Sequence, residues 1–327
     1  MKILVAGGCG YVGSVLVPIL CSSGYDVTVI DLCWFSNYVD PRAKLVKKDL
    51  FTCTEEDFKE VDVAIFIAGV SNDPSSEFDF QRSFIYNAAL PPYLAFIAKR
   101  AGVKRYIYAS TASVYGFTYD KLLDETSEIS SNYAYGISKY AAECGIMHLR
   151  DDKFSVICLR KGTISGVSKT RMRFDLLVNT MVKTALVDGT ITITNPALWR
   201  PLLALKDAVY GGYMRAVQAH PACHGIFNLA YSNYTLGEVA DIVKDTVEQR
   251  TGRSIKLIIK NVDDLRNYKI STEKAKTILG FHPRFSVESI VHDILDNWHL
   301  FESDILADKY YNINVCKKLF KNALNIS

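Results

Sequence analysis

Hydrophobic and polar residues follow one another along the first half of the chain in a pattern that predicts strands separated by helices. Short runs rich in β-branched and other apolar residues predict strands at 2–7, 26–31, 43–50, 61–69, 103–110 and 154–160. Longer amphipathic stretches between them predict helices at 11–24, 79–101 and 132–150. Strands that alternate with helices form right-handed βαβ units, so the pattern indicates an α/β fold with a doubly wound parallel sheet.

The pattern becomes less regular after about residue 162. It predicts helices at 172–188, 206–218 and 236–249, and strands at 190–194, 225–231 and 254–260. Thr235 and Glu238 form a capping box that opens the third of these helices. We therefore expect two domains, 1–162 and 163–327. The second is a smaller, mixed α/β lobe, interleaved with the first across a soft boundary.

Composition and charge narrow the class of protein. Of the 327 residues, 49% are hydrophobic and 22% are charged, which is typical of a folded globular chain. Lys and Arg number 38 against 35 Asp and Glu, and the net charge of +3 argues against a nucleic-acid or membrane-surface partner. Glycines interrupt the apolar N-terminus and no apolar run reaches about 18 residues, so we expect neither a signal peptide nor a membrane span.

The eight cysteines are scattered, with no CxxC pair and no Cys/His spacing typical of a zinc site. The six histidines show no mutual spacing that suggests a metal. We therefore expect reduced thiols, a cytoplasmic protein and no metal site.

A glycine motif, GGCGYVG, lies between the first predicted strand and the first predicted helix. Gly7, Gly10 and Gly13 allow a tight turn, close approach of the backbone to a pyrophosphate, and close packing of helix on strand. Asp31 ends the next strand, where a carboxylate accepts hydrogen bonds from an adenosine ribose and repels a 2′-phosphate. Because no arginine follows Asp31 directly, the motif favours NAD over NADP and predicts a Rossmann-type NAD-binding domain over 1–162.

The candidate catalytic groups lie later in the same half. Tyr135 and Lys139 are four residues apart in a predicted helix, which places phenol and ammonium on one face, about 5–6 Å apart at Cβ. An adjacent ammonium lowers the pKa of a phenol, so that Tyr135 exchanges a proton with a substrate hydroxyl while a hydride moves to or from nicotinamide. Thr111 follows the strand 103–110 and is placed to hydrogen-bond the same substrate oxygen.

These motifs resemble the extended short-chain dehydrogenase/reductases, specifically the NAD-dependent epimerase/dehydratase family that acts on nucleotide sugars. The resemblance spans essentially the whole chain and includes IAG (67–69), STASVYG (110–116), YAYGISK (133–139), SKTRMRFDLLVN (168–179) and DLRNYKISTEKAKTILGF (264–281). It implies catalytic roles for Thr111, Tyr135 and Lys139. Around the cofactor we expect Gly7, Gly10, Tyr11, Val12, Gly13, Asp31, Asp49, Leu50, Ala68, Asn87, Tyr135 and Lys139.

The chain departs from the family pattern in two places. The 4,6-dehydratases of the family have Asp-Glu directly after the catalytic Thr, whereas Ala112 and Ser113 stand here, which disfavours a dehydratase. The usual HLAA element is FIAG in this chain. The segment SNDPSSEF that follows it is either a plain turn or a substrate-contacting loop formed by Ser71, Asn72 and Asp73.

The resemblance also implies a substrate site, for a nucleoside-diphosphate sugar, and a homodimer. A near-neutral protein binds a diphosphate through a few placed cations and hydrogen-bonding groups. The positions implied by the family are Asn179, Arg200 and Arg266. SKTRMRFD adds Arg171 and Arg173, which are alternatively a solvated, basic helix start.

The favoured function is a nucleotide-sugar epimerase that forms a transient 4-keto sugar and returns the hydride to its opposite face. Such an enzyme supplies sugars for surface polysaccharides or glycoconjugates. A net 4-dehydrogenase or 4-ketoreductase uses the same catalytic residues and stays open. A redox-inert NAD-binding regulator is the third alternative, although such proteins typically lose the Tyr/Lys pair that this chain retains.

Overall fold

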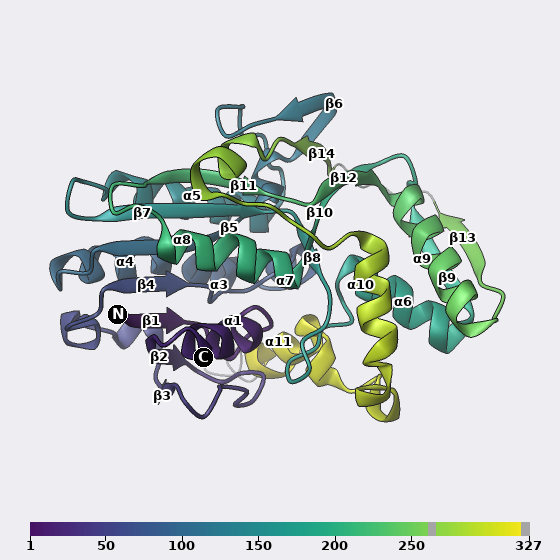
Figure 1. Cartoon of the computed structure of the whole chain (residues 1–327), viewed down its shortest axis with the longest axis horizontal. Coiled ribbons are helices and arrows are strands. Elements are labelled where there is room, and N and C mark those ends of the chain that lie inside the picture. Colours follow the sequence, from purple (N-terminus) through teal and green to yellow (C-terminus); the bar gives the residue numbers. More distant parts are fainter. Residues whose placement is uncertain (261–265, 322–327) are drawn as a thin grey trace.

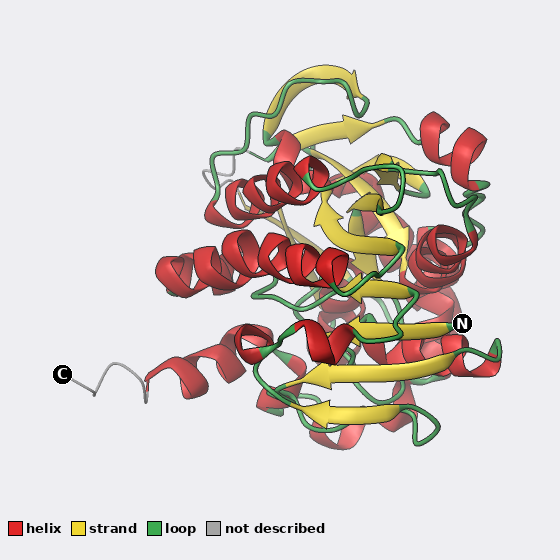
Figure 2. Cartoon of the chain, turned by 90° about the vertical axis from the view of Figure 1, so that its left-hand side faces the viewer, coloured by secondary structure: helices red, strands yellow, loops and turns green. Residues whose placement is uncertain are grey.

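The computed structural model describes residues 1–260 and 266–321, and its centre is a seven-stranded parallel sheet (Figure 1). The strand order is β11-β7-β5-β4-β1-β2-β3. The bounds are β1 (Lys2–Ala6), β2 (Asp26–Asp31), β3 (Lys44–Lys47), β4 (Val63–Phe66), β5 (Arg105–Thr111), β7 (Ser155–Lys161) and β11 (Gly225–Leu229). Helices lie on both faces of this sheet (Figure 2), so the predicted doubly wound α/β fold is confirmed.

Side chains along each strand alternate between two hydrophobic cores. In β1, Ile3 and Val5 belong to the larger core with α1 (Gly13–Ser22), whereas Leu4 and Ala6 belong to the second. The second core contains side chains of α4 (Leu90–Arg100) and α5 (Ala134–His148). Because both faces are covered, β4 and β5 are buried along their whole length, as the continuous apolar run in β4 predicts.

The helix expected over 79–101 is confirmed as one uninterrupted helical run over 80–100 that contains a π-helical turn. Its parts are α3 (Phe80–Phe84), the π-helical turn Ile85–Ala89 and α4, and the short helix α2 (Asp73–Phe78) precedes it. Pro91 and Pro92 follow the π-helical turn directly and have no N–H groups to donate back to it. The helix therefore continues through the two prolines.

The second half of the chain forms three small sheets with helices around them, which confirms the smaller mixed α/β lobe. Its elements, together with β6, are β6 (Phe117–Leu123), β8 (Thr163–Ser165), β9 (Thr190–Thr194), β10 (Trp199–Ala204), β12 (Ser232–Thr235), β13 (Lys256–Lys260), β14 (Asn267–Ile270), α6 (Leu177–Asp188), α7 (Leu205–Asp207), α8 (Met214–Gln218), α9 (Leu236–Thr251), α10 (Val287–Asp296) and α11 (Asn312–Lys321). The strands β6, β8, β10, β12 and β14 were not predicted. The helix expected from residue 172 begins only at Leu177, because Met172 and Phe174 are buried in an irregular segment before it.

The two halves share structure across residue 162. The strand β11 returns to the large sheet and pairs with β7, Ile226 lying opposite Cys158. β6, from the first half, pairs with β14 from the second. The boundary at residue 162 stays a prediction. Within the described ranges, no helix is long and apolar enough to cross a membrane.

Candidate active site

A cavity of about 580 Å³ opens at the carboxyl ends of the parallel strands. Residues that follow β1, β2, β4, β5 and β7 line it, together with residues from the second half of the chain. Every residue predicted to take part in catalysis or binding lines this one cavity, with the exception of Asn179. The fold therefore gathers the candidate residues, while their individual roles stay predictions.

At two positions of the glycine loop, which lines the cavity, a Cβ would clash with backbone atoms. A Cβ on Gly7, whose φ is 94°, would lie 2.5 Å from the backbone nitrogen of Ala68. A Cβ on Gly13 would lie 2.3 Å from the carbonyl oxygen of Gly8. The loop leads directly into α1, whose first N–H groups and dipole favour an anion. This cradle fits the pyrophosphate of a dinucleotide.

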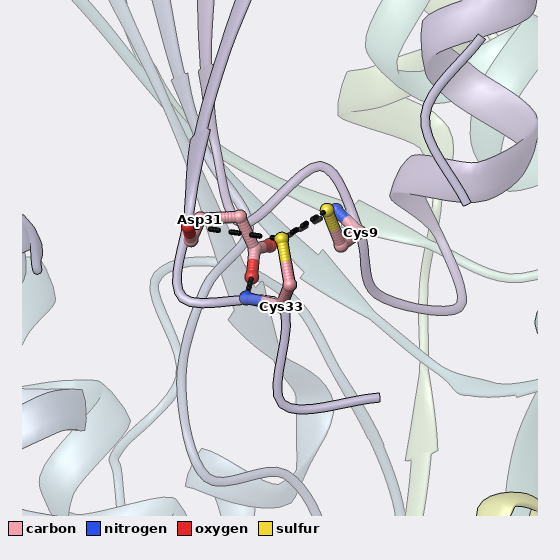
Figure 3. A group of neighbouring side chains, drawn as sticks. All are labelled: Cys9, Asp31 and Cys33. Carbon is pink, nitrogen blue, oxygen red and sulfur yellow. Dashed lines mark hydrogen bonds between the residues drawn. The ribbon is translucent and has the colours of Figure 1, made fainter. Parts of the chain in front are cut away.

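Asp31 lies beside the loop with its carboxylate oriented by two backbone amides. Its Oδ2 accepts a hydrogen bond from Cys9 N at 2.9 Å, and its Oδ1 accepts one from Cys33 N at 2.7 Å (Figure 3). Burial raises the pKa of the Asp31 carboxyl, and the two amide bonds oppose that rise. A carboxylate fixed at the end of β2 fits the ribose hydroxyls of NAD.

The other residues expected around the cofactor support loops that line the cavity. Asn87 holds the chain after β4: its Oδ1 accepts from Val70 N at 3.0 Å and its Nδ2 donates to Val70 O at 2.8 Å. Asp49 caps the short turn that contains Leu50, accepting from Phe51 N at 3.0 Å. In each case a side chain bonds to the backbone of a loop that lines the cavity and so fixes the position of that loop.

Tyr135 and Lys139 extend from α5 into the cavity, close to Tyr108. The Lys139 side chain is 4% exposed, and its Nζ lies 4.2 Å from the centre of the Tyr108 ring. Burial lowers the pKa of Lys139 to about 7. Burial also raises the pKa of Tyr135; Asp73 adds to this rise and Arg173 opposes it. The predicted lowering of the Tyr135 pKa by Lys139 is therefore wrong for this structure, because burial disfavours both charged forms.

Thr111 belongs to a short chain of hydroxyl groups that the sequence analysis only half identified. Its Oγ1 accepts from Ser113 N at 3.1 Å and donates to Ser113 Oγ at 3.1 Å. Ser113 Oγ lies 3.3 Å from the hydroxyl of Tyr268, and both residues line the cavity. The motif STASVYG contains Ser113, but the sequence alone indicates only that an acidic residue is absent from this position, and not that Ser113 hydrogen-bonds Thr111.

Lys161 is a cavity residue that the sequence analysis missed. It ends β7 opposite Thr111, and its Nζ donates to the Tyr213 hydroxyl at 2.8 Å. Burial lowers the pKa of Lys161 well below its usual value, and the charge of Lys139 adds to this effect. A lysine at the carboxyl end of an apolar strand was the available indication in VICLRK.

Arg171 and Arg173 are buried, so the alternative of a solvated, basic helix start is wrong. Arg173 forms an ion pair with Asp175 at 2.8 Å. The Arg171 guanidinium donates to Asn312 Oδ1 at 2.6 Å and lies 4.0 Å from the centre of the Phe35 ring. Both arginines line the cavity, and the contacts with Asp175, Asn312 and Phe35 fix their side chains within the protein.

The segment after FIAG connects the two halves of the chain. Three consecutive residues each contact the second half: Ser71 accepts from Arg173 at 3.0 Å, Asn72 donates to Asp175 at 3.3 Å, and Asp73 pairs with Arg266 at 2.6 Å. Since Asp73–Phe78 is helical and Asn72 caps that helix, SNDPSSEF is not a plain turn. Arg200 donates to the backbone oxygen of Arg266. Residues 264–265 of the motif DLRNY lie outside the described ranges.

Asn179 is the predicted substrate contact that the structure places elsewhere. Its side chain is fully buried: Oδ1 accepts from Gly166 N at 2.9 Å, and Nδ2 donates to Arg173 O at 2.7 Å and Gly166 O at 3.2 Å. These bonds use the amide within the protein. We therefore assign Asn179 a structural role in place of the predicted one.

Comparison with known proteins decides the family. The model of the "NAD dependent epimerase/dehydratase family" matches residues 3–230, more than half of the chain. This chain belongs to that family. It is accordingly an NAD-dependent enzyme, which confirms the predicted cofactor and the resemblance. The cradle of glycines and Asp31 described above fits NAD, whose nicotinamide accepts and returns a hydride and, as a cation, favours a nearby phenolate.

Relatives within the family differ in activity. The chain is 26% identical to a UDP-glucose 4-epimerase of Lacticaseibacillus casei, over 91% of this chain and 97% of that protein. It is 25% identical to UDP-glucuronic acid decarboxylase 6 of Arabidopsis thaliana, over 87% and 84%. Among solved structures, the UDP-glucuronic acid 4-epimerase of Bacillus cereus, in complex with UDP-glucuronic acid and NAD, is similar with a TM-score of 0.80 at 21% identity, over 91% and 98%.

The lowered pKa of Lys139 predicts a pH dependence of stability in the cofactor-free enzyme. Between a folded pKa of about 7 and the usual value of 10.5, the unfolded chain binds the proton that the folded chain lacks. Stability therefore rises with pH across this window, by about 1 kcal/mol per unit just above neutrality. Replacing Lys139 by Met should reduce the slope of the unfolding free energy between pH 7 and 9 by that amount, measured by urea denaturation. An unchanged slope would show that Lys139 is charged in the folded enzyme.

Proposed function

We propose that this enzyme interconverts the C4 epimers of a nucleoside-diphosphate sugar through a transient 4-keto sugar. The observation that carries the proposal is the set of groups at one end of the cavity: Tyr135, Lys139 and Thr111, with Ala112 and Ser113 in place of an acidic pair. Oxidation at C4 needs a base for the proton of the C4 hydroxyl and a hydrogen bond to its oxygen, and Tyr135 and Thr111 would supply them. The second acid and base that a 4,6-elimination of water requires are absent from these two positions.

The proposed proton transfer uses the Tyr135 phenol. Its oxygen, as the phenolate, would take the proton of the C4 hydroxyl, and NAD bound in the glycine cradle would supply the hydride acceptor that makes C4 a carbonyl. Thr111 would hydrogen-bond the same oxygen. The proposed role of Lys139, as the cation that stabilises the Tyr135 phenolate, requires this lysine to be protonated in the complex, against the burial that lowers its pKa to about 7. When the keto sugar presents its opposite face, the hydride returns and Tyr135 gives the proton back. No cofactor is consumed in this cycle.

The nucleoside diphosphate is proposed to lie in the part of the cavity that is lined by residues from the second half of the chain. Arg200 and Arg266 line it there and supply the positive charge that a diphosphate needs, in a chain whose net charge is only +3. Arg171 and Arg173 extend the same wall, Arg173 through its contact with Ser71. The loop of Ser71, Asn72 and Asp73 would then contact the sugar.

A net 4-dehydrogenase or 4-ketoreductase is the second candidate, since it needs the same three catalytic residues. An epimerase requires the keto sugar to rotate in the site and keeps its reduced cofactor, whereas a net dehydrogenase requires no rotation and releases the reduced cofactor. A redox-inert regulator is disfavoured by the complete Thr111, Tyr135 and Lys139 set.

The test is to incubate the purified enzyme with UDP-, GDP-, dTDP- and CDP-sugars while following absorbance of reduced nicotinamide and NMR of the sugar. We expect inversion at C4 for one sugar with no net change in absorbance. Reduced cofactor formed in proportion to the sugar consumed would instead establish the dehydrogenase. If NAD binds and no sugar reacts, the regulator replaces both.

We also propose a homodimer and a role in surface-polysaccharide or glycoconjugate synthesis. Tyr93 and Phe96 on α4, and Ile137 and Tyr140 on α5, are large side chains that are 37–46% exposed, and the two helices pack against each other. Such an apolar surface supports pairing with a second copy. Light scattering should give a molar mass of two chains.

A further inference from the structure

Cys9 and Cys33 lie side by side next to Asp31, and no role assigned above uses their thiols. Their Sγ atoms are 3.5 Å apart and face each other (Figure 3). Cys9 is part of the glycine loop and is 1% exposed, whereas Cys33 is partly exposed just beyond the end of β2. A disulfide bond is about 2.05 Å long, so the sulfur atoms need to approach by only about 1.5 Å.

We propose that Cys9 and Cys33 are a site of reversible disulfide formation, and that the disulfide weakens binding of NAD. The proposed oxidant is a hydroperoxide. Cys33, the more exposed thiol, attacks the peroxide oxygen and becomes a sulfenic acid as an alcohol, or water, leaves. The Cys9 thiol then attacks this sulfur, the S–S bond forms and a water leaves. Two thiols thus lose two electrons and two protons, which reduce the peroxide.

The surroundings of the pair favour a neutral disulfide over bound metal. Cys9, Cys33 and Asp31 offer three ligand atoms within 4.8 Å of one another, the arrangement of a small metal site. Metal binding, however, requires both thiols as thiolates beside a carboxylate. Burial and the charge of Asp31 raise the pKa of Cys9, so that this thiol stays protonated unless a bound cation offsets the negative charge. A disulfide carries no charge and needs no such cation.

The pair is linked to NAD through the backbone that orients Asp31. The N–H groups of the same two cysteines hold its two carboxylate oxygens, at 2.9 and 2.7 Å. Drawing the sulfur atoms together moves these donors, and with them the carboxylate and the glycine loop. Cys33 already has a left-handed backbone, with φ at 57°, so little freedom remains to absorb the shift. By thermodynamic reciprocity, bound NAD protects the thiols from oxidation to the same extent.

The test treats the whole enzyme with hydrogen peroxide, maps its peptides by mass spectrometry and titrates NAD by calorimetry. We expect a peptide pair joined through Cys9 and Cys33, lighter by two hydrogen atoms and released by dithiothreitol. The dissociation constant of NAD should rise about tenfold on oxidation and fall again on reduction. Cys9→Ser and Cys33→Ser should each lose the cross-link and the sensitivity of NAD binding to peroxide. Cys144→Ser, which removes an exposed thiol on α5, should keep both.

Three results would overturn the proposal. The first is that the thiols at positions 9 and 33 stay reduced in peroxide, and the second is that the cross-linked and reduced enzymes bind NAD equally well. The third is that the enzyme binds one zinc ion per chain and that Cys33→Ser abolishes this binding. The readout is cofactor binding, so the outcome does not depend on which sugar reacts. If Cys9→Ser fails to fold because its side chain is buried, Cys33→Ser carries the test alone, since that side chain is partly exposed.

Discussion

Replacing Tyr135 by Phe is expected to lower kcat by about 10²- to 10⁴-fold while NAD binds as before, because the change removes only the hydroxyl that exchanges the proton. The ring that fills the cavity wall stays in place. The measurement is turnover of the sugar identified in the substrate panel, together with calorimetric titration of NAD. Binding without turnover would separate the chemical step from the assembly of the site.

The matched control for this change is Tyr119→Phe. Tyr119 lies on β6, its side chain is 84% exposed, and it lies neither in the cavity lining nor in the surface proposed to form the dimer. Loss of its hydroxyl should leave kcat within about twofold of the original enzyme, as expected of a surface change. If Tyr135→Phe retained comparable activity, another group would have to be the base, and Tyr135 would be a wall residue.

Replacing Gly13 by Ala is expected to abolish NAD binding and to destabilise the protein by about 1–3 kcal/mol. The added Cβ would lie 2.3 Å from the carbonyl oxygen of Gly8, which is backbone and cannot move aside alone. The glycine loop and the start of α1 would have to separate, and the cradle for the pyrophosphate would open. Thermal unfolding and NAD titration of the same sample measure both effects.

Gly10→Ala provides the comparison within the same loop. A Cβ there has a single close neighbour, Gly7 O at 3.4 Å, so the fold should keep its stability within about 0.5 kcal/mol. Because Gly10 lines the cavity, NAD binding should weaken in a protein that remains folded. Equal stability of the Gly10 and Gly13 variants would contradict the steric argument.

The sequence predicts the central strands of the large sheet well because β4 and β5 are buried along their whole length and consist largely of apolar and aromatic residues. β2, at Asp26–Asp31, coincides with its predicted range, and so does β9, at Thr190–Thr194, an alternating strand of a smaller sheet. The shortest strands of the smaller sheets are harder to predict, because strands such as β8, with three residues, gain their stability from partners far along the chain. No local periodicity records such pairing.

The site was predictable where chemistry is tied to a motif and not where it depends on burial. The glycines, Asp31 and Thr111 lie at strand ends, which share one edge of the sheet, and Tyr135 and Lys139 lie four residues apart on the helix α5. The position of Lys161 in the cavity and the internal hydrogen bonds of Asn179 depend on side-chain orientations that only the packed fold determines. The shifted pKa of Lys139 likewise reflects desolvation that only the assembled cavity imposes.

Hydrogen bonds connect the NAD-binding half of the chain to the other half. Neither half is therefore expected to work when it is combined with the matching half of a relative. The Tyr11 hydroxyl donates to Gly166 O at 2.6 Å, and Ser14 Oγ lies 2.7 Å from Ser168 Oγ. Tyr11 lies within the glycine loop and Ser14 directly follows it, so the second half of the chain braces the cofactor cradle. A chimera that joined residues 1–162 to the matching half of a relative would inherit a cradle without its brace and a sheet without its own β11. A change of substrate in this chain is therefore expected to succeed more readily by substitution within the intact chain than by exchange of one half.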